Sequence, residues 1–106
     1  MEQSMVGIAA GMALVGKKPY VYSTAPFVTY RVLEQIRDDI CYQNLNVKLI
    51  GVKMSGFIGF THTTYGNEDL DLFKNLPNIQ AFAPETEEEL KTLMLNNLNN
   101  AYYVRI

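Results

Sequence analysis

Hydrophobic positions follow two alternating patterns along the chain. Short runs rich in β-branched and aromatic residues have the composition of strands, at residues 19–23, 46–52, 79–83 and 101–106. The stretches between the runs carry apolar side chains at helical spacing, at residues 28–42, 68–74 and 86–97. Strands that alternate with helices are typical of a parallel sheet with helices on its faces. We therefore expect an α/β domain with a parallel sheet of about four strands and helices on both faces.

A further helix is predicted over residues 1–16, ahead of the first strand. Ser4 is its expected N-cap, and Gly16 its expected closing residue at C′. Apolar side chains point nearly all round this helix, which predicts that it is buried: Val6, Ile8, Ala9, Met12, Ala13 and Leu14. Gly7 and Gly11 lie four residues apart on one face and predict that something packs closely against it.

Glu2 stands at the amino end of this helix. Next to a buried helix, we expect desolvation to raise the pKa of its carboxyl group. The alternative is an ordinary solvated glutamate near a chain terminus. In parallel sheets, ligands bind at the carboxyl ends of the strands, and crossover helices begin at that same edge. The sequence therefore predicts that Glu2, the loop that contains Phe27 and the long loop that contains His62 converge there.

Composition restricts the classes of function. The 106 residues suffice for one domain, and 48% of them are hydrophobic. A net charge of −2 without a basic face argues against nucleic-acid binding. No apolar run approaches the roughly 18 residues of a membrane span. Cys41 is the one cysteine, so no internal disulfide can form, and a reducing, cytoplasmic location is expected.

His62 and an aromatic pair are the other candidates for chemistry. His62 is the one histidine and lies in a glycine-rich stretch, where it could act as an acid, a base or a hydrogen-bond donor; the alternative is an ordinary surface histidine. One histidine and one cysteine are too few for a zinc site. Phe27 and Tyr30 lie three residues apart at the start of a predicted helix, where they could belong to the core or form a platform for a ligand.

Four motifs carry a resemblance to a known family, in order along nearly the whole chain. They are EQSMVGIAAGMALVGKKPYVYSTAPF, QIRDDICYQNLNVKLIGV, THTTYGNEDLDLFKNLPNI and AFAPETEEEL. The chain resembles the pyrimidine-binding domain of transketolase and its relatives, which include 1-deoxyxylulose-5-phosphate synthase and the separate C-terminal subunits of split transketolases. The β subunit of pyruvate dehydrogenase shares the first motif.

The resemblance implies a role for each candidate residue. Glu2 matches the family's acid, which hydrogen-bonds the N1′ nitrogen of thiamine diphosphate. Phe27, with Tyr30 nearby, would pack on the aminopyrimidine ring. His62 matches the histidine of the family's GPTH motif, which faces substrate and cofactor; here the motif is GFTH, with Phe60 in place of proline.

The resemblance also implies what would complete the site. Residues 1–106 would form a partial pyrimidine-binding domain that lacks the family's first strand and helix. Magnesium and the diphosphate would be held by a complementary domain or subunit, in a homo- or hetero-oligomer, and the isolated chain would be inactive. The implied reaction transfers a two-carbon ketol unit between sugar phosphates. The alternatives are a non-catalytic assembly module or fragment, or the equivalent domain of a 1-deoxyxylulose-5-phosphate synthase or 2-oxo acid dehydrogenase.

Overall fold

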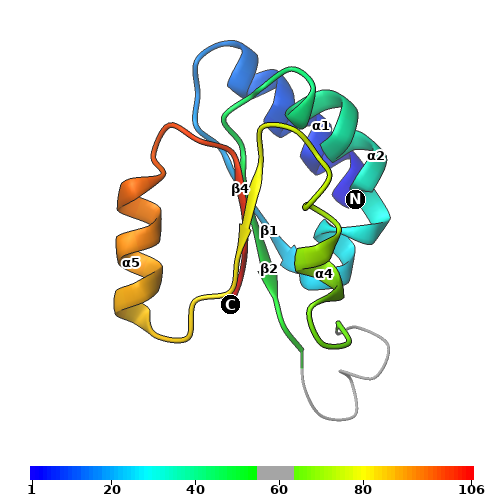
Figure 1. The fold of residues 1–106 in the computed structure, drawn as a ribbon. Helices are drawn as coiled ribbons and strands as arrows, with labels where there is room; N and C mark the ends of the chain where they lie inside the picture. The colour runs from blue at the N-terminus through cyan, green and yellow to red at the C-terminus, as the bar shows by residue number, and fades with distance from the viewer. Residues whose placement is uncertain (55–63) are drawn as a thin grey trace.

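A four-stranded parallel sheet forms the centre of the computed structural model, which describes residues 1–54 and 64–106 (Figure 1). The strand order is β1-β2-β4-β3, and each neighbouring pair is parallel. The strands are β1 (Tyr20–Thr24), β2 (Lys48–Val52), β3 (Gln80–Phe82) and β4 (Tyr102–Arg105). The predicted strand number and direction are therefore confirmed.

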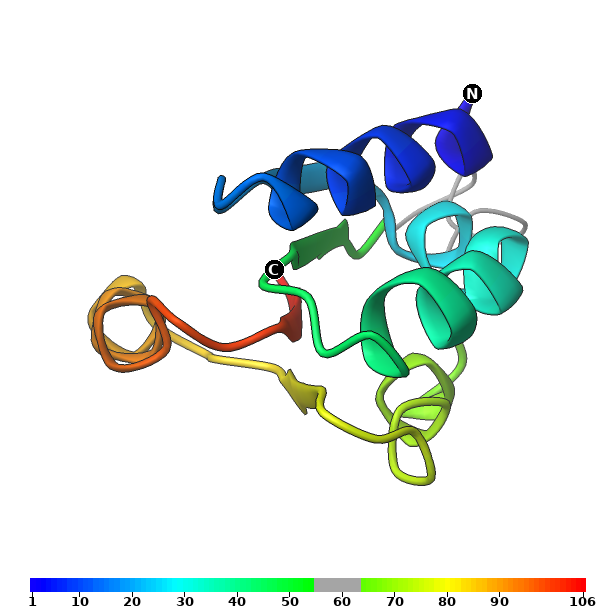
Figure 2. The same ribbon diagram turned by 90° about the horizontal axis from the view of Figure 1, so that it is seen from above.

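Helices cover both faces of the sheet, as predicted. Figures 1 and 2 show α5 on one side of the sheet, and α1, α2 and α4 on the other. The α-helices are α1 (Glu2–Leu14), α2 (Leu33–Gln35), α4 (Glu68–Asp71) and α5 (Glu87–Asn96). Two 3₁₀ turns and one π-helix complete the described elements: η1 (Ala25–Val28), η2 (Tyr30–Val32) and η3 (Ile36–Cys41).

The main core lies between the sheet and the larger helical layer. Side chains alternate between the two faces of a strand, so Val21, Leu49 and Tyr103, which are aligned across β1, β2 and β4, share one face. These three side chains pack in one buried cluster with Val6 of α1 and Phe73. The Phe73 and Tyr103 rings are stacked with their centroids 4.9 Å apart. This packing fixes α1 against the sheet.

Residues 28–42 do not form the single helix that the sequence predicts. The backbone at Thr29 has φ −122° and ψ −83°, and this separates η1 from η2. The Thr29 hydroxyl is buried and donates to the carbonyl oxygen of Ala25 at 2.7 Å. The predicted apolar face is nevertheless kept, because Val32, Ile36 and Ile40 are all completely buried.

The first helix differs from expectation at its amino end. It begins at Glu2 with Met1 as N-cap, so the prediction that Ser4 caps it is wrong. Its carboxyl end is as predicted. Gly16 adopts φ +87°, and the amide groups of Gly16 and Lys17 donate to the carbonyl oxygens of Ala13 and Met12. This is the Schellman arrangement, which favours glycine at C′.

The prediction that α1 is buried nearly all round is also wrong. Ile8, Met12 and Leu14 are 65%, 43% and 63% exposed, because one stripe of the helix, with Val6, Ala9 and Ala10, meets the core. A Cβ atom added at Gly7 or Gly11 would have no neighbour within 4 Å among the described residues. The close packing predicted for that glycine face is therefore not found in this part of the chain.

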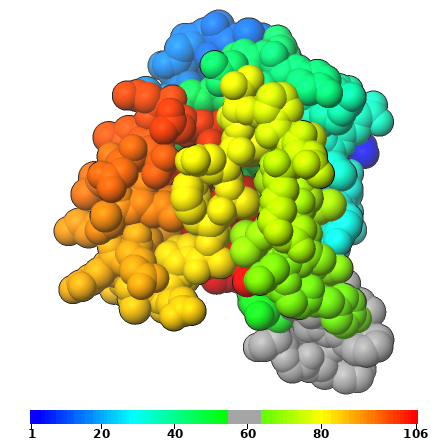
Figure 3. All heavy atoms as spheres, viewed as in Figure 1, coloured from blue at the N-terminus to red at the C-terminus, as the bar shows by residue number. Residues whose placement is uncertain are grey.

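The α5 helix begins as predicted but packs loosely. The Thr86 hydroxyl accepts a hydrogen bond from the Glu89 amide, and the Glu89 carboxylate accepts one from the Glu85 amide. No residue of α5 is fully buried, and side chains of α5 line an open hollow of about 540 Å³ together with Phe82 of β3. Figure 3 shows α5 in orange and the α4 region in yellow-green on either side of β3.

The described helices include no candidate for a membrane span. Within residues 1–54 and 64–106, none combines the length and apolar character that a membrane-spanning helix needs.

Candidate functional site

The Glu2 carboxylate lies at the carboxyl edge of the sheet, beside the end of β1. Its Oε1 accepts a hydrogen bond from the Ser23 hydroxyl at 3.2 Å. Its Oε2 lies 3.2 Å from Nη1 of Arg31 and 3.2 Å from the amino group of Met1. The Glu2 side chain is 16% exposed. The first turn of α1, the end of β1 and η2 therefore hold this carboxylate together.

The pKa of Glu2 is lowered to about 2, opposite to the direction expected from the sequence. The main causes, in order, are the hydrogen bond from its own backbone amide, the Met1 amino group and the Arg31 guanidinium. Desolvation opposes them but has a smaller effect. The expectation failed mainly because the backbone amide of Glu2 and the adjacent Met1 amino group stabilise the carboxylate. Arg31 adds to their effect, and since it lies 29 residues away, its position depends on the tertiary structure.

Phe27 joins Glu2 through the same arginine. The Arg31 guanidinium carbon lies 3.8 Å from the centroid of the Phe27 ring, which is a cation–π contact. Glu2 and Phe27 therefore flank one guanidinium, and the predicted convergence of the acid and the Phe27 loop is observed. Arg31 and Ser23 were not among the sequence candidates. The spacing of Arg31, four residues after Phe27 at the start of a predicted helix, was the signal that could have identified it.

Tyr30 interacts with the start of α4. Burial raises the pKa of its hydroxyl, and a hydrogen bond with the Glu68 carboxylate together with nearby acidic charge adds to the effect. The residue as a whole is 46% exposed. Tyr30 therefore connects η2 to the start of α4, and its contact is with Glu68.

His62 lies outside the described residues, as does the rest of the GFTH motif. The chain that follows it is described from Thr64 onward and is attached firmly to β4. Nη1 of Arg105 donates to the carbonyl oxygen of Gly66 at 2.9 Å and to Oδ1 of Asp69 at 2.7 Å. Arg105 is the last residue of β4, so this segment returns to the same edge of the sheet as Glu2.

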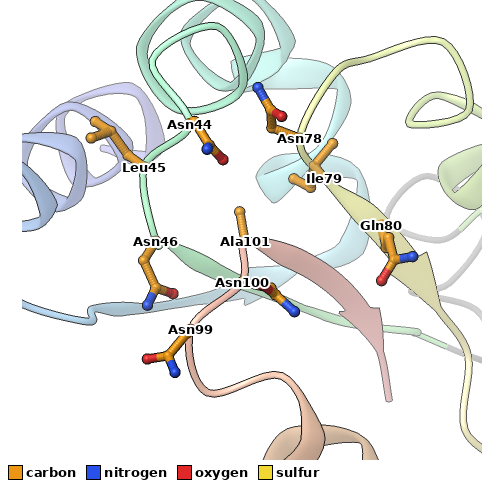
Figure 4. A pocket seen from close by; sticks show the side chains of 9 residues that line it. All are labelled: Asn44, Leu45, Asn46, Asn78, Ile79, Gln80, Asn99, Asn100 and Ala101. Carbon is orange, nitrogen blue, oxygen red and sulfur yellow. The ribbon is translucent and has the colours of Figure 1, made fainter.

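A cavity at the opposite edge has a different character. Its volume is about 460 Å³, and its walls come from the segments that precede β2, β3 and β4 (Figure 4). The lining is rich in amides and consists of Asn44, Leu45, Asn46, Asn78, Ile79, Gln80, Asn99, Asn100 and Ala101. None of the candidate residues contributes to it. The candidate site is therefore the cluster around Glu2.

Metal-binding groups are not gathered in the described chain. Across residues 1–54 and 64–106, no group of three or more His, Cys, Asp or Glu side chains is placed to hold a metal ion.

The sequence profile of one family matches nearly the whole chain. Residues 1–105 match the family described as "Transketolase, pyrimidine binding domain". The chain belongs to this family. Its four parallel strands and flanking helices agree with that assignment. A solved structure described as "Split gene transketolase, inactive beta4 tetramer" superposes on this transketolase-type domain with a TM-score of 0.84 and is 34% identical in sequence. That match covers 99% of this chain and 34% of the other.

Curated relatives of the transketolase-type domain include both split and continuous enzymes. One subunit of the apulose-4-phosphate transketolase of Actinobacillus succinogenes is 37% identical over 108 residues, which cover 99% of this chain and 35% of the relative. The 1-deoxy-D-xylulose-5-phosphate synthase of Bacillus cytotoxicus is 40% identical over 89 residues, which cover 83% of this chain and 14% of the relative. The chain thus spans about a third or less of these relatives' length.

Proposed function

We propose that this chain binds the aminopyrimidine ring of thiamine diphosphate in a transketolase-like enzyme. The observation that carries the proposal is that the Glu2 carboxylate and the Phe27 ring lie together at the carboxyl edge of the sheet. Oε2 of Glu2 lies 3.2 Å from Nη1 of Arg31, and the centroid of the Phe27 ring lies 3.8 Å from the guanidinium carbon of the same arginine. An acid beside an aromatic surface fits an aromatic base with a ring nitrogen. Membership of the pyrimidine-binding family supports the same ligand.

Glu2 is the proposed acid–base partner of the ring. Its lowered pKa keeps the carboxylate ionised at neutral pH, so that it can accept a hydrogen bond from a protonated ring nitrogen and stabilise that protonation state. Phe27 would pack on the ring, with Tyr30 nearby, and His62 would face substrate and cofactor. When bound, thiamine diphosphate supplies the carbanion chemistry that protein side chains lack.

The complete enzyme would transfer a two-carbon ketol unit between sugar phosphates. A complementary domain or subunit would hold the diphosphate and Mg²⁺, which makes the working enzyme a homo- or hetero-oligomer. Two relatives support a split arrangement: one is named as a single subunit of a transketolase, and the other is titled an inactive β4 tetramer of a split-gene transketolase. We propose accordingly that this chain alone is inactive.

A second candidate reaction follows from the synthase relative. The 40% identity to a 1-deoxy-D-xylulose-5-phosphate synthase over 89 residues favours that reaction as the alternative. The products separate the two, since one enzyme forms 1-deoxy-D-xylulose 5-phosphate and the other transfers a ketol unit between two sugar phosphates.

The direct test is the substitution Glu2→Gln in the chain assembled with its diphosphate-binding complement. Glutamine keeps the size and can still hydrogen-bond the ring, but it carries no charge to stabilise a protonated ring nitrogen. A lost charge-assisted hydrogen bond is worth about 1.5–3 kcal/mol, or about ten- to a hundredfold in rate. We therefore expect the thiazolium proton of bound cofactor to exchange with deuterium about ten to a hundred times more slowly, with a smaller change in cofactor affinity.

The matched control is Glu34→Gln, which removes an exposed carboxylate from α2. It should exchange at the parent rate. If Glu2→Gln also exchanges at the parent rate, Glu2 is not the activating acid and the proposed site is wrong.

A further inference from the structure

Arg31 makes two contacts at once in the candidate site. Its Nη1 lies 3.2 Å from Oε2 of Glu2, and its guanidinium carbon lies 3.8 Å from the centroid of the Phe27 ring. We propose that Arg31 is a positioning residue, which holds the Glu2 carboxylate and the Phe27 ring in one arrangement for an incoming aromatic base. This inference rests on the proposed function.

The geometry explains why the carboxylate has a defined orientation. Arg31 and the Met1 amino group lie at Oε2, while the Ser23 hydroxyl donates to Oε1, so both oxygens are engaged. The donors belong to three different segments: the start of the chain, β1 and η2. A carboxylate that is held at both oxygens loses the freedom to rotate, which is the condition for aligned catalysis.

The guanidinium group suits both contacts better than another cation. Its planar shape lets it stack on an aromatic face while its N–H groups point outward to a carboxylate. A lysine ammonium is a compact charge and does not provide the same stack. The Arg31 side chain is 49% exposed, so the guanidinium group is accessible to an incoming ring.

Charge is the second way in which Arg31 acts through Glu2. The cationic groups at the carboxylate are the guanidinium and the Met1 amino group, and the other donors are the uncharged Ser23 hydroxyl and the amide of Glu2 itself. The acidic residues of the α4 region, Glu68, Asp69 and Asp71, act on Tyr30. Removal of the Arg31 charge should therefore raise the pKa of Glu2 from about 2 toward its ordinary value.

Arg37 provides a matched control on the same segment. It has the same kinds of contact as Arg31: Nη1 lies 2.7 Å from Oδ1 of Asp38, and the guanidinium lies 4.6 Å from the centroid of the Tyr42 ring. Its side chain is also 49% exposed, but these contacts are made away from Glu2. If the loss of any such arginine lowered cofactor affinity or activation, the substitution of Arg37 would have the same effect as the substitution of Arg31.

The experiment compares Arg31→Met, Arg31→Lys and Arg37→Met in the complete enzyme assembled with its complement. Titration calorimetry gives the affinity for thiamine diphosphate, and deuterium exchange at the thiazolium carbon gives its activation, each as a function of pH. An exposed cation–π contact is worth about 0.5–1 kcal/mol, so loss of the stack should weaken binding by about two- to fivefold. We expect this weakening in both Arg31 variants.

The pH profile separates charge from stacking. In Arg31→Met, the acid limb of the exchange profile should move to higher pH, because Glu2 takes up a proton more readily without the guanidinium. In Arg31→Lys, the acid limb should stay in place while the affinity falls. Arg37→Met should match the parent in both measurements.

Two results would overturn the inference: an Arg31→Met variant that matches Arg37→Met, or an Arg31→Lys variant that matches the parent in affinity as well as in the acid limb. In either case, an effect of Glu2→Gln on exchange would leave the proposed function intact. Failure of the parent to bind thiamine diphosphate, or parent-like exchange in Glu2→Gln, would instead reject the proposed function.

Discussion

The hydroxyl of Tyr103 donates a hydrogen bond to Oδ2 of Asp69 at 2.6 Å, and both residues are completely buried. Arg105 lies 2.7 Å from the other oxygen, Oδ1, and its side chain is 12% exposed. Burial and the bond to Asp69 raise the pKa of Tyr103. Through these contacts a buried carboxylate joins α4 to β4 and fixes the segment that follows residue 63.

The first prediction is that Asp69→Asn destabilises the fold. The substitution leaves the Arg105 guanidinium without its buried carboxylate, and hydrogen bonds to charged groups are worth about 1.5–3 kcal/mol. We expect the free energy of unfolding to fall by about that amount in urea denaturation. Asp71, which also lies in α4, forms an exposed ion pair with Lys74. Asp71→Asn removes this ion pair and should lower the free energy of unfolding by less than about 1 kcal/mol. Equal losses for the two variants would contradict this account.

The second prediction concerns the stability of the fold at acid pH. The pKa of Glu2 is lower in the folded chain than its ordinary value of 4.5, so its contribution to stability is present above pH 4.5. That contribution is lost as the pH falls from 4.5 to about 2, because the folded state then binds the proton less readily than the unfolded state. The stability difference between the parent and Glu2→Gln should shrink over this interval in acid-unfolding curves. A difference that stays constant would show that Glu2 is not held ionised.

The third prediction concerns alkali and Lys48, which is completely buried. Its ammonium group donates to the carbonyl oxygen of Leu98 at 2.9 Å and to the side chain of Asn46. Burial, followed by repulsion from Lys18, lowers the pKa of Lys48 to about 8. The unfolded state therefore binds more protons between pH 8 and 10.5, and the stability of the fold should rise with pH over that range.

The size of this rise has an upper limit of about 3.5 kcal/mol, since a displacement of one pKa unit is worth about 1.4 kcal/mol. Thermal unfolding of the parent and Lys48→Met at several pH values would measure it. The variant should lack the rise. Lys18→Met should reduce it, because the repulsion that helps to lower the pKa of Lys48 is gone. A parent whose stability falls steadily above pH 8, in parallel with Lys48→Met, would reject the assignment.

The fourth prediction compares two glycines. A Cβ atom at Gly51 would lie 2.5 Å from the hydroxyl oxygen of Tyr103, whereas one at Gly11 would meet nothing within 4 Å in the described chain. Gly51→Ala should destabilise the fold by about 1–3 kcal/mol through overpacking. Gly11→Ala should stabilise it by up to about 1 kcal/mol, because alanine is the better helix former. Thermal melts of both variants would check this, and an equal effect at the two sites would contradict the packing around Tyr103.

Gly11→Ala also tests the close packing that the sequence predicts for the glycine face of α1. If the glycine face of α1 packs against another subunit, the substitution that stabilises the isolated chain should weaken assembly with the complement. Analytical ultracentrifugation of the mixed proteins would measure this. Parent-like assembly would place the interface elsewhere.

Local patterns in the sequence were enough to predict the strands and their parallel arrangement. The four strand segments are short β-branched and aromatic runs separated by helical periods, and all four pair in parallel. The Thr86 cap and the positive φ of Gly16 were likewise predictable, because each depends on residues within one turn. The family resemblance came from contiguous motifs of the same kind, and the match over residues 1–105 confirms it.

The tertiary structure alone decided the features that join distant residues. Ile8 and Met12 are exposed although they are apolar, because burial depends on which stripe of α1 meets the sheet. The pKa of Glu2 falls partly because Arg31, 29 residues away, lies at its carboxylate and opposes the effect of desolvation. Periodicity in the sequence indicates which side chains are apolar or charged. The interaction between two charges depends on the distance between them, and only folding brings distant charges together.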